Sequence, residues 1–131
     1  MNKPNLISGA PGAPAAIGAY SQVGIVPAGA ELAYLSGQIP LDPETGVVVT
    51  GGIEAQTTQV MKNLSSVLAH IGLDFSAVVK TTIFLTDIND FAKVNALYEA
   101  ALLSAKPARA TVQVSALPKG ANIEIEMIAV K

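Results

Sequence analysis

The chain has 131 residues, of which 50% are hydrophobic and 14% are charged, and its formal net charge is −2. Because it contains no cysteine and a single histidine, a disulfide framework, a thiolate nucleophile and a cysteine-type zinc site are excluded, and a histidine-ligated metal is disfavoured. The eight lysines and arginines are scattered rather than clustered, which disfavours nucleic-acid binding.

The length predicts one domain covering residues 1–131, large enough to bury about two-thirds of the surface that the unfolded chain exposes. No uninterrupted apolar run approaches the ~18 residues that a membrane helix needs, and the N-terminus lacks the apolar region of a signal peptide. We therefore expect a cytoplasmic protein with no membrane partner. The high hydrophobic content predicts that part of the surface meets another subunit.

The first 50 residues predict an irregular start followed by short strands. Prolines and glycines interrupt residues 1–18, which predicts an irregular N-terminal arm. Residues 20–26 and 31–36 are predicted to form a hairpin around a proline–glycine turn. A second turn signal precedes a short third strand at residues 47–50.

Two helices are predicted from apolar residues that recur at helical spacing. The first covers residues 53–71 and is followed by Gly72, which stands where a C-terminal glycine cap belongs. The second follows an apolar stripe over residues 91–102 and ends before Pro107. Between the helices, β-branched and aromatic residues dominate residues 78–85, which predicts a buried strand.

Two further strands, each with an apolar and a polar face, are predicted near the C-terminus. Residues 107–117 alternate in polarity and place Arg109 on the polar face. After a turn signal at residues 118–122, residues 123–127 alternate again and place Glu124 on the polar face. The apolar faces consist of Ala110, Val112, Val114 and Ala116 in the first strand and Ile123, Ile125 and Met127 in the second.

Arg109 and Glu124 are the best candidates for chemistry. A guanidinium holds a small carboxylate through two parallel charge-assisted hydrogen bonds. A carboxylate such as Glu124 accepts a proton from water, orients the water, or returns the proton to a leaving group. Together the two residues indicate hydrolysis of a small carboxylic acid. The alternative interpretation, which the pattern alone favours, is a solvated strand arginine and a glutamate on the wet face of an edge strand.

The order of the elements predicts an α+β two-layer sandwich, in which two helices cover one face of a mixed six-stranded sheet. The other face carries enough apolar side chains that we expect subunits to cover it. A tight hairpin near Gly120 would leave Arg109 roughly 20 Å along the strand from the partner of Glu124. Either the two strands are not direct neighbours, or the site draws on more than one subunit.

Several spaced motifs resemble the reactive-intermediate deaminase (Rid, YjgF-type) family over nearly the whole chain. The segment PARATVQVSALPKGANIEIEMIAV, which contains Arg109 and Glu124, is similar to the signature segment of that family. Other segments resemble family landmarks in the family's order, namely AAIGAYSQ, SGQIP, DPETG and VVKTTIFLTDINDFAKVNALYEA.

The resemblance implies a chorismate-mutase-like fold, in which three subunits form a homotrimer with ligand clefts at the subunit boundaries. It also implies hydrolysis of reactive enamine and imine acids, such as 2-aminoacrylate and 2-iminopropanoate, to 2-oxo acids and ammonia. This is the reaction of a 2-iminobutanoate/2-iminopropanoate deaminase. Because the carbon of an iminium is already electrophilic, we expect this reaction to proceed without a cofactor or a metal.

Carried over residue by residue, the resemblance makes Arg109 the carboxylate anchor and Glu124 the residue that positions or activates water. Thr111 stands where the best-known branch of the family commonly has cysteine, and its backbone can contact the substrate. The other substrate-binding residues that the resemblance implies are Tyr20, Ser36, Gly37, Ile39, Phe91 and Asn95. Each of these six has an alternative interpretation as an ordinary core, turn or surface residue.

Two other functions remain open at this point. A trimeric small-carboxylate-binding or regulatory protein without turnover is motivated by Thr111 and by a shorter segment before Arg109 than in the best-known branch. An endoribonuclease is the third hypothesis, which the absence of a basic patch and of a histidine pair disfavours. We expect a small 2-imino or 2-oxo acid as the ligand.

Overall fold

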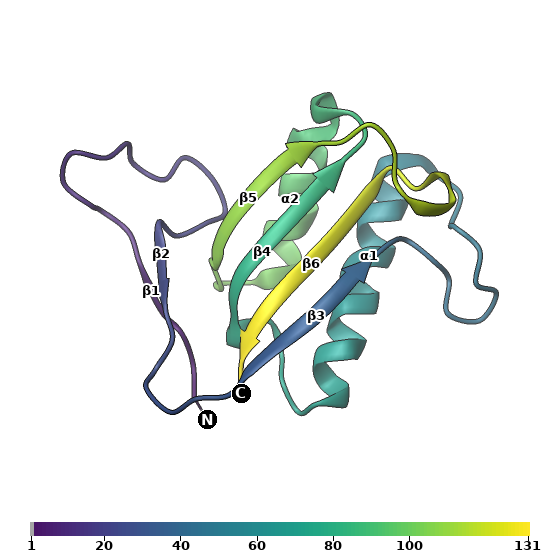
Figure 1. Cartoon of the computed structure of the whole chain (residues 1–131). Coiled ribbons are helices and arrows are strands. Elements are labelled where there is room, and N and C mark those ends of the chain that lie inside the picture. The colour runs from purple at the N-terminus through teal and green to yellow at the C-terminus, as the bar shows by residue number, and fades with distance from the viewer. Residues whose placement is uncertain (1) are drawn as a thin grey trace.

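The structure is a computed structural model that describes residues 2–131 and has two layers (Figure 1). One layer is a four-stranded sheet, the other is a pair of α-helices, and a two-stranded ribbon lies beside the sheet. The strands are β1 (Asn5–Ile7), β2 (Val23–Ile25), β3 (Leu32–Gln38), β4 (Val78–Leu85), β5 (Ala108–Gln113) and β6 (Ile123–Val130). The helices are α1 (Gly52–His70) and α2 (Phe91–Leu102), with short 3-10 helices at Phe75–Ala77, Ile88–Asp90 and Pro118–Gly120.

The sheet has the strand order β3-β6-β4-β5, so the last strand of the chain lies inside the sheet. β6 pairs antiparallel with both β3 and β4, whereas β4 and β5 are parallel. The connection between the two parallel strands runs through α2, because a parallel pair needs a long crossover. The predicted α+β sandwich with a mixed sheet and two helices on one face is therefore confirmed.

The predicted hairpin of residues 20–26 and 31–36 is wrong. β2 pairs with β1, and β3 pairs with the distant C-terminal strand β6. Reciprocal backbone hydrogen bonds tie the start of β3 to the C-terminus, from Glu31 N–H to Lys131 O at 3.2 Å and back at 2.8 Å. The main sheet accordingly has four strands instead of the six predicted. The pairing with β6 sets Leu35 beside Met127 in the core. This burial favours the long-range pairing over a local hairpin.

Two other segments also differ from the prediction. Residues 47–50 form no strand and contribute only a single bridge between Leu41 and Val48. The N-terminal arm was predicted to be irregular throughout, but it contains β1, which pairs with β2. The resulting ribbon approaches β4 closely at Gly24, where a Cβ would lie 2.6 Å from Val79 Cγ2. Only glycine permits this approach without a shift of the strand.

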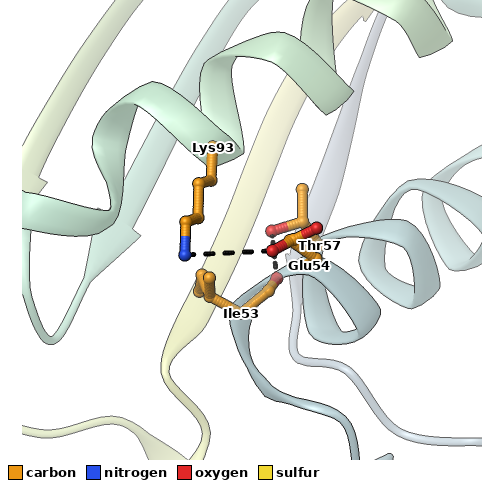
Figure 2. A network of polar contacts seen from close by, with 4 residues as sticks. All are labelled: Ile53, Glu54, Thr57 and Lys93. Atoms are coloured by element: carbon orange, nitrogen blue, oxygen red, sulfur yellow. Dashed lines mark hydrogen bonds and ion pairs between the residues drawn. The ribbon is translucent and has the colours of Figure 1, made fainter.

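The helices match the prediction closely. α1 ends at His70, and Gly72 follows as the expected glycine cap, with a φ of 76° and an N–H that donates to Ala69 O at 3.0 Å. α1 and α2 also meet at the surface, where Lys93 Nζ lies 3.9 Å from Glu54 Oε1 (Figure 2). Across residues 2–131, neither helix is long and apolar enough to cross a membrane.

The two faces of the sheet differ in what covers them. The helix-covered face carries the core, in which Ile83 and Ile125 are completely buried. The opposite face has no covering layer within residues 2–131, and Tyr34 is 72% exposed there. The strand registers place several large apolar side chains on this uncovered face, among them Leu32, Tyr34, Phe84, Val112 and Ile128.

Candidate active site

Arg109 lies on β5, the edge strand next to α2, and points to the helix-covered face. Its register partner on β4 is Thr81, which is fully buried on that face. Arg109 Nη1 donates a hydrogen bond to Asn95 Oδ1 of α2 at 2.7 Å. Gly18 lies against the other terminal nitrogen, since a Cβ there would be 3.4 Å from Arg109 Nη2. A strand, a helix and the loop before β2 therefore hold the guanidinium between them.

Three aromatic rings surround the Arg109 guanidinium. Its Cζ lies 5.2 Å from the ring centroid of Tyr98, 5.5 Å from that of Phe91 and 5.7 Å from that of Tyr20, all within cation–π range. Partial burial lowers the pKa of Arg109, and the nearby Tyr98, Tyr20 and Glu99 act in the opposite direction. The guanidinium still carries its charge at neutral pH. It is a partly desolvated cation, and its attraction for an anion is strengthened.

Tyr98 forms the inner wall behind the guanidinium. It is fully buried, and its hydroxyl donates to Thr81 Oγ1 at 3.0 Å. Burial raises the pKa of Tyr98 to about 12, although the Thr81 hydrogen bond and the Arg109 charge act against this. Apolar spacing alone assigns Tyr98 to helix packing. The spacing of Phe91, Asn95 and Tyr98 nevertheless indicates a place for Tyr98 beside the candidate site, since intervals of four and three residues put all three on one face of α2.

An open cavity of about 530 Å³ lies in front of the guanidinium, a size suited to a small ligand. It is lined by Tyr20, Ile88, Phe91, Arg109 and Thr111. Ile88, on the 3-10 helix before α2, is not among the residues that the sequence indicated. The hydroxyl of Thr111 is buried and has no hydrogen-bond partner among residues 2–131. The arginine half-site is defined here as Tyr20, Phe91, Asn95, Arg109 and Thr111.

Glu124 belongs to a second group of residues, at the junction of β6 and β3. The register of β3 against β6 shifts between Leu35 and Gln38, so Ser36 and Gly37 lie in a bulge. The partly buried Glu124 side chain lies over this bulge, since a Cβ built on Gly37 would be 2.9 Å from Glu124 Cδ. The glutamate half-site is defined here as Ser36, Gly37, Ile39 and Glu124.

The two half-sites do not meet within one chain. On β4, which lies between β5 and β6, Arg109 pairs with Thr81 and Glu124 pairs with Phe84. Side chains alternate along a strand, so Arg109 faces the helices and Glu124 faces away from them. Their β4 partners are three residues apart, which adds about 10 Å along the strand. The strands that carry Arg109 and Glu124 are thus not direct neighbours, one of the two alternatives that the sequence left open.

Comparisons with known proteins identify the family. The sequence profile of the family described as endoribonuclease L-PSP matches residues 11–131. The chain belongs to this family. A protein of Rattus norvegicus named 2-iminobutanoate/2-iminopropanoate deaminase is 52% identical over 119 residues, which cover 91% of this chain and 85% of the rat protein. Protein DfrA of Myxococcus xanthus is 59% identical over 118 residues, covering 90% of this chain and 89% of that protein.

A solved structure agrees with these sequence matches. It is a protein from Yersinia pestis described as a member of the conserved Rid protein family, and it shares 47% identity and a TM-score of 0.75 with this chain. The similarity covers 95% of this chain and 98% of the Yersinia chain. The resemblance to the Rid family is therefore confirmed.

The half-sites of this L-PSP family chain offer one cation and one carboxylate. The cation can hold an anion, and the carboxylate can accept and return a proton. In the part of the chain that the structure describes, no three His, Cys, Asp or Glu side chains are grouped so that they could hold a metal ion. The chemistry that the arrangement supports is acid–base catalysis on a bound anion.

We expect Tyr98 to stay protonated until the pH approaches 12. Burial raises its pKa from 10.0 to about 12, so between these values the folded state retains a proton that the unfolded state releases. The stabilisation is fully present below pH 10 and is lost as the pH rises through 12. The difference between tyrosinate absorbance titrations of wild type and Tyr98→Phe isolates this step. A difference step centred at pH 10 would contradict the buried environment.

Gly37→Ala is expected to fold normally and to displace the Glu124 carboxylate. Gly37 has no positive φ, so alanine fits its backbone, and the new methyl group meets the mobile end of a side chain. A crystal structure reports the Glu124 position, and a thermal melt reports the stability. Gly24→Ala is the matched control, because its methyl group meets Val79 and should lower the thermal midpoint further. An unmoved Glu124 in Gly37→Ala would refute the contact.

Proposed function

We propose that this chain hydrolyses reactive enamine and imine acids, such as 2-aminoacrylate and 2-iminopropanoate, to 2-oxo acids and ammonia. The observation that carries the proposal is the Arg109 guanidinium, which Asn95 and three rings hold at the wall of an open cavity. The name of the rat relative, a 2-iminobutanoate/2-iminopropanoate deaminase, supports the same reaction.

Arg109 holds the substrate carboxylate in this proposal. The hydrogen bond to Asn95 uses one of the five N–H donors of the guanidinium, so a bidentate pair with a carboxylate remains available. Tyr20 and Phe91 exclude part of the solvent around the cation, which strengthens its attraction for the anion. Thr111, at the wall of the same cavity, contacts the substrate beside Arg109.

Glu124 handles the proton of the attacking water. The carbon of an iminium is already electrophilic, so the main requirement is an oriented water beside a held substrate. The water oxygen bonds to the imine carbon as one proton passes to the Glu124 carboxylate, which gives a carbinolamine. Glu124 returns that proton to nitrogen, and the C–N bond breaks. As the carbonyl forms, the hydroxyl proton passes through Glu124 to the departing ammonia, so the 2-oxo acid and ammonium leave. Every step uses side chains of this protein and water.

We infer that the active unit is a homotrimer whose sites form between neighbouring subunits. Arg109 and Glu124 point to opposite faces of the sheet, so one chain cannot present both to one substrate. The uncovered sheet face supports assembly, since it presents Tyr34, Leu32 and Val112 to solvent in the isolated chain. The number three follows from the Rid family resemblance.

A coupled assay tests the reaction itself. A PLP-dependent serine dehydratase generates 2-aminoacrylate, and imine decay is followed with and without this protein. Acceleration by the wild-type chain supports the proposal, and its absence would overturn it. Saturable 2-oxo-acid binding without acceleration would favour a binding protein without turnover.

Arg109→Ala is expected to lower kcat/KM by at least about a hundredfold, because two charged hydrogen bonds worth about 1.5–3 kcal/mol each are lost. Arg109→Lys keeps the charge but loses the planar fork, so it should rescue little activity. Imine hydrolysis, oligomer mass and thermal midpoint are measured on the same samples. A stable and fully active Arg109→Ala assembly would falsify the anchor role.

Mixing two inactive variants is expected to restore activity if each site combines two subunits. Each hybrid trimer of Arg109→Ala and Glu124→Gln subunits has both intact residues at about a third of its sites, so random mixing of equal amounts restores up to about a quarter of all sites. The variants are unfolded and refolded together so that their subunits exchange, and imine hydrolysis is compared with that of each variant treated alone. If hybrid trimers form, as mass spectrometry reports, and remain inactive, the shared site is disproved.

A further inference from the structure

Helix α1 carries a row of amide side chains that reaches the strand ends beside Glu124. Gln56, Gln59 and Asn63 are spaced at intervals of three and four residues, so they share one face of the helix. Gln56 is buried, which is uncommon for a glutamine and indicates satisfied hydrogen bonds. None of the three belongs to either half-site. Their hydrogen bonds lead instead to the two segments that flank the contact between Glu124 and Gly37.

Gln56 holds Asn122, the residue that precedes β6. Its Oε1 accepts the Asn122 backbone N–H at 2.9 Å, and its Nε2 donates to Asn122 Oδ1 at 2.9 Å. Asn122 is also fixed to the end of β4, since its Nδ2 donates to Thr86 Oγ1 at 3.0 Å and its carbonyl accepts the Thr86 N–H at 3.1 Å. Four hydrogen bonds therefore fix the chain two residues before Glu124.

Asn63 holds the segment that leaves β3. Its Nδ2 donates to Leu41 O at 2.9 Å and to Ile39 O at 3.4 Å. Its Oδ1 accepts a hydrogen bond from Gln59 Nε2 at 2.9 Å, which fixes the orientation of the amide. Ile39 lies two residues after Gly37, just as Asn122 lies two residues before Glu124. The hydrogen bonds of Asn63 and those of Gln56 are therefore equally close in the chain to Gly37 and Glu124, respectively.

We propose that Gln56 and Asn63 are positioning residues for the Glu124 carboxylate, an inference that rests on the proposed function. The Glu124 side chain lies over Gly37, so its position depends on where the start of β6 lies relative to the end of β3. The backbone ladder is interrupted there by the β3 bulge. α1 provides one rigid base to which both segments are hydrogen-bonded.

Gln56 and Asn63 should affect the catalytic step and leave substrate binding unchanged. Loss of the Gln56 or the Asn63 hydrogen bonds releases one of the two segments that set the Glu124 position. Misplacement of a reacting group by about 1 Å costs up to about a hundredfold in rate. The arginine half-site lies on β5, α2 and the loop before β2, so loss of the Gln56 or the Asn63 hydrogen bonds leaves this half-site unchanged. We therefore expect kcat to fall while 2-oxo-acid affinity stays the same.

The test uses the full chain with Gln56→Met and, separately, Asn63→Leu. Each substitution removes the hydrogen bonds and nearly conserves the side-chain volume. We expect kcat for imine hydrolysis to fall about tenfold, with the dissociation constant for 2-oxobutanoate unchanged within about twofold. Glu54→Gln is the matched control on the same helix, because Glu54 is exposed and forms a surface ion pair with Lys93 (Figure 2).

A double variant distinguishes positioning from general stabilisation. If Gln56 acts through Glu124, adding Gln56→Met to Glu124→Gln should lower kcat no further. Unchanged kcat in both single variants, full additivity in the double variant, or equal loss of affinity would overturn the inference. Failure of both single variants to assemble would assign the residues to folding and overturn it too. Inactive wild-type protein would instead overturn the proposed function, and this inference with it.

Discussion

Successive residues of a β-strand point to opposite faces of the sheet, and this constraint decides what kind of site the chain can build. Arg109 lies on the helix-covered face with its register partner Thr81, whereas Glu124 lies on the uncovered face with its register partner Phe84. No side-chain rotation carries a group through a paired sheet. The proposed pairing of Arg109 with Glu124 at one substrate therefore requires a second subunit. Within residues 2–131, the face that holds the Glu124 carboxylate is also the face without a covering layer.

Incomplete compensation of charge is what suits Arg109 for binding. Burial among Tyr20, Phe91 and Tyr98 lowers its pKa, which shows that the surroundings destabilise the cation relative to water. The ring faces and the Asn95 oxygen compensate part of this cost. In the proposed reaction, the substrate carboxylate completes the compensation in a partly desolvated place, where a charged hydrogen bond is stronger than in water.

The two helices serve the two half-sites separately. α2 presents Phe91, Asn95 and Tyr98 to the guanidinium, and α1 reaches the strand ends beside Glu124 through Gln56 and Asn63. Both helices rest on the same apolar core, so each half-site is supported within a single chain. In the proposed trimer, two preorganised surfaces are joined, which lowers the entropic cost of arranging the reacting groups.

The sequence by itself determined the helices, the strand at residues 78–85 and the polar faces of Arg109 and Glu124, because these follow from local periodicities of 3.6 and two residues. It also determined the family, through motifs that keep their spacing along the chain. It did not determine that β3 pairs with the C-terminal strand, that β4 separates Arg109 from Glu124, or that Tyr98 backs the guanidinium. Only the tertiary structure decided these, because strand order results from competition between pairings of residues distant in the chain, which leaves no mark on any local pattern.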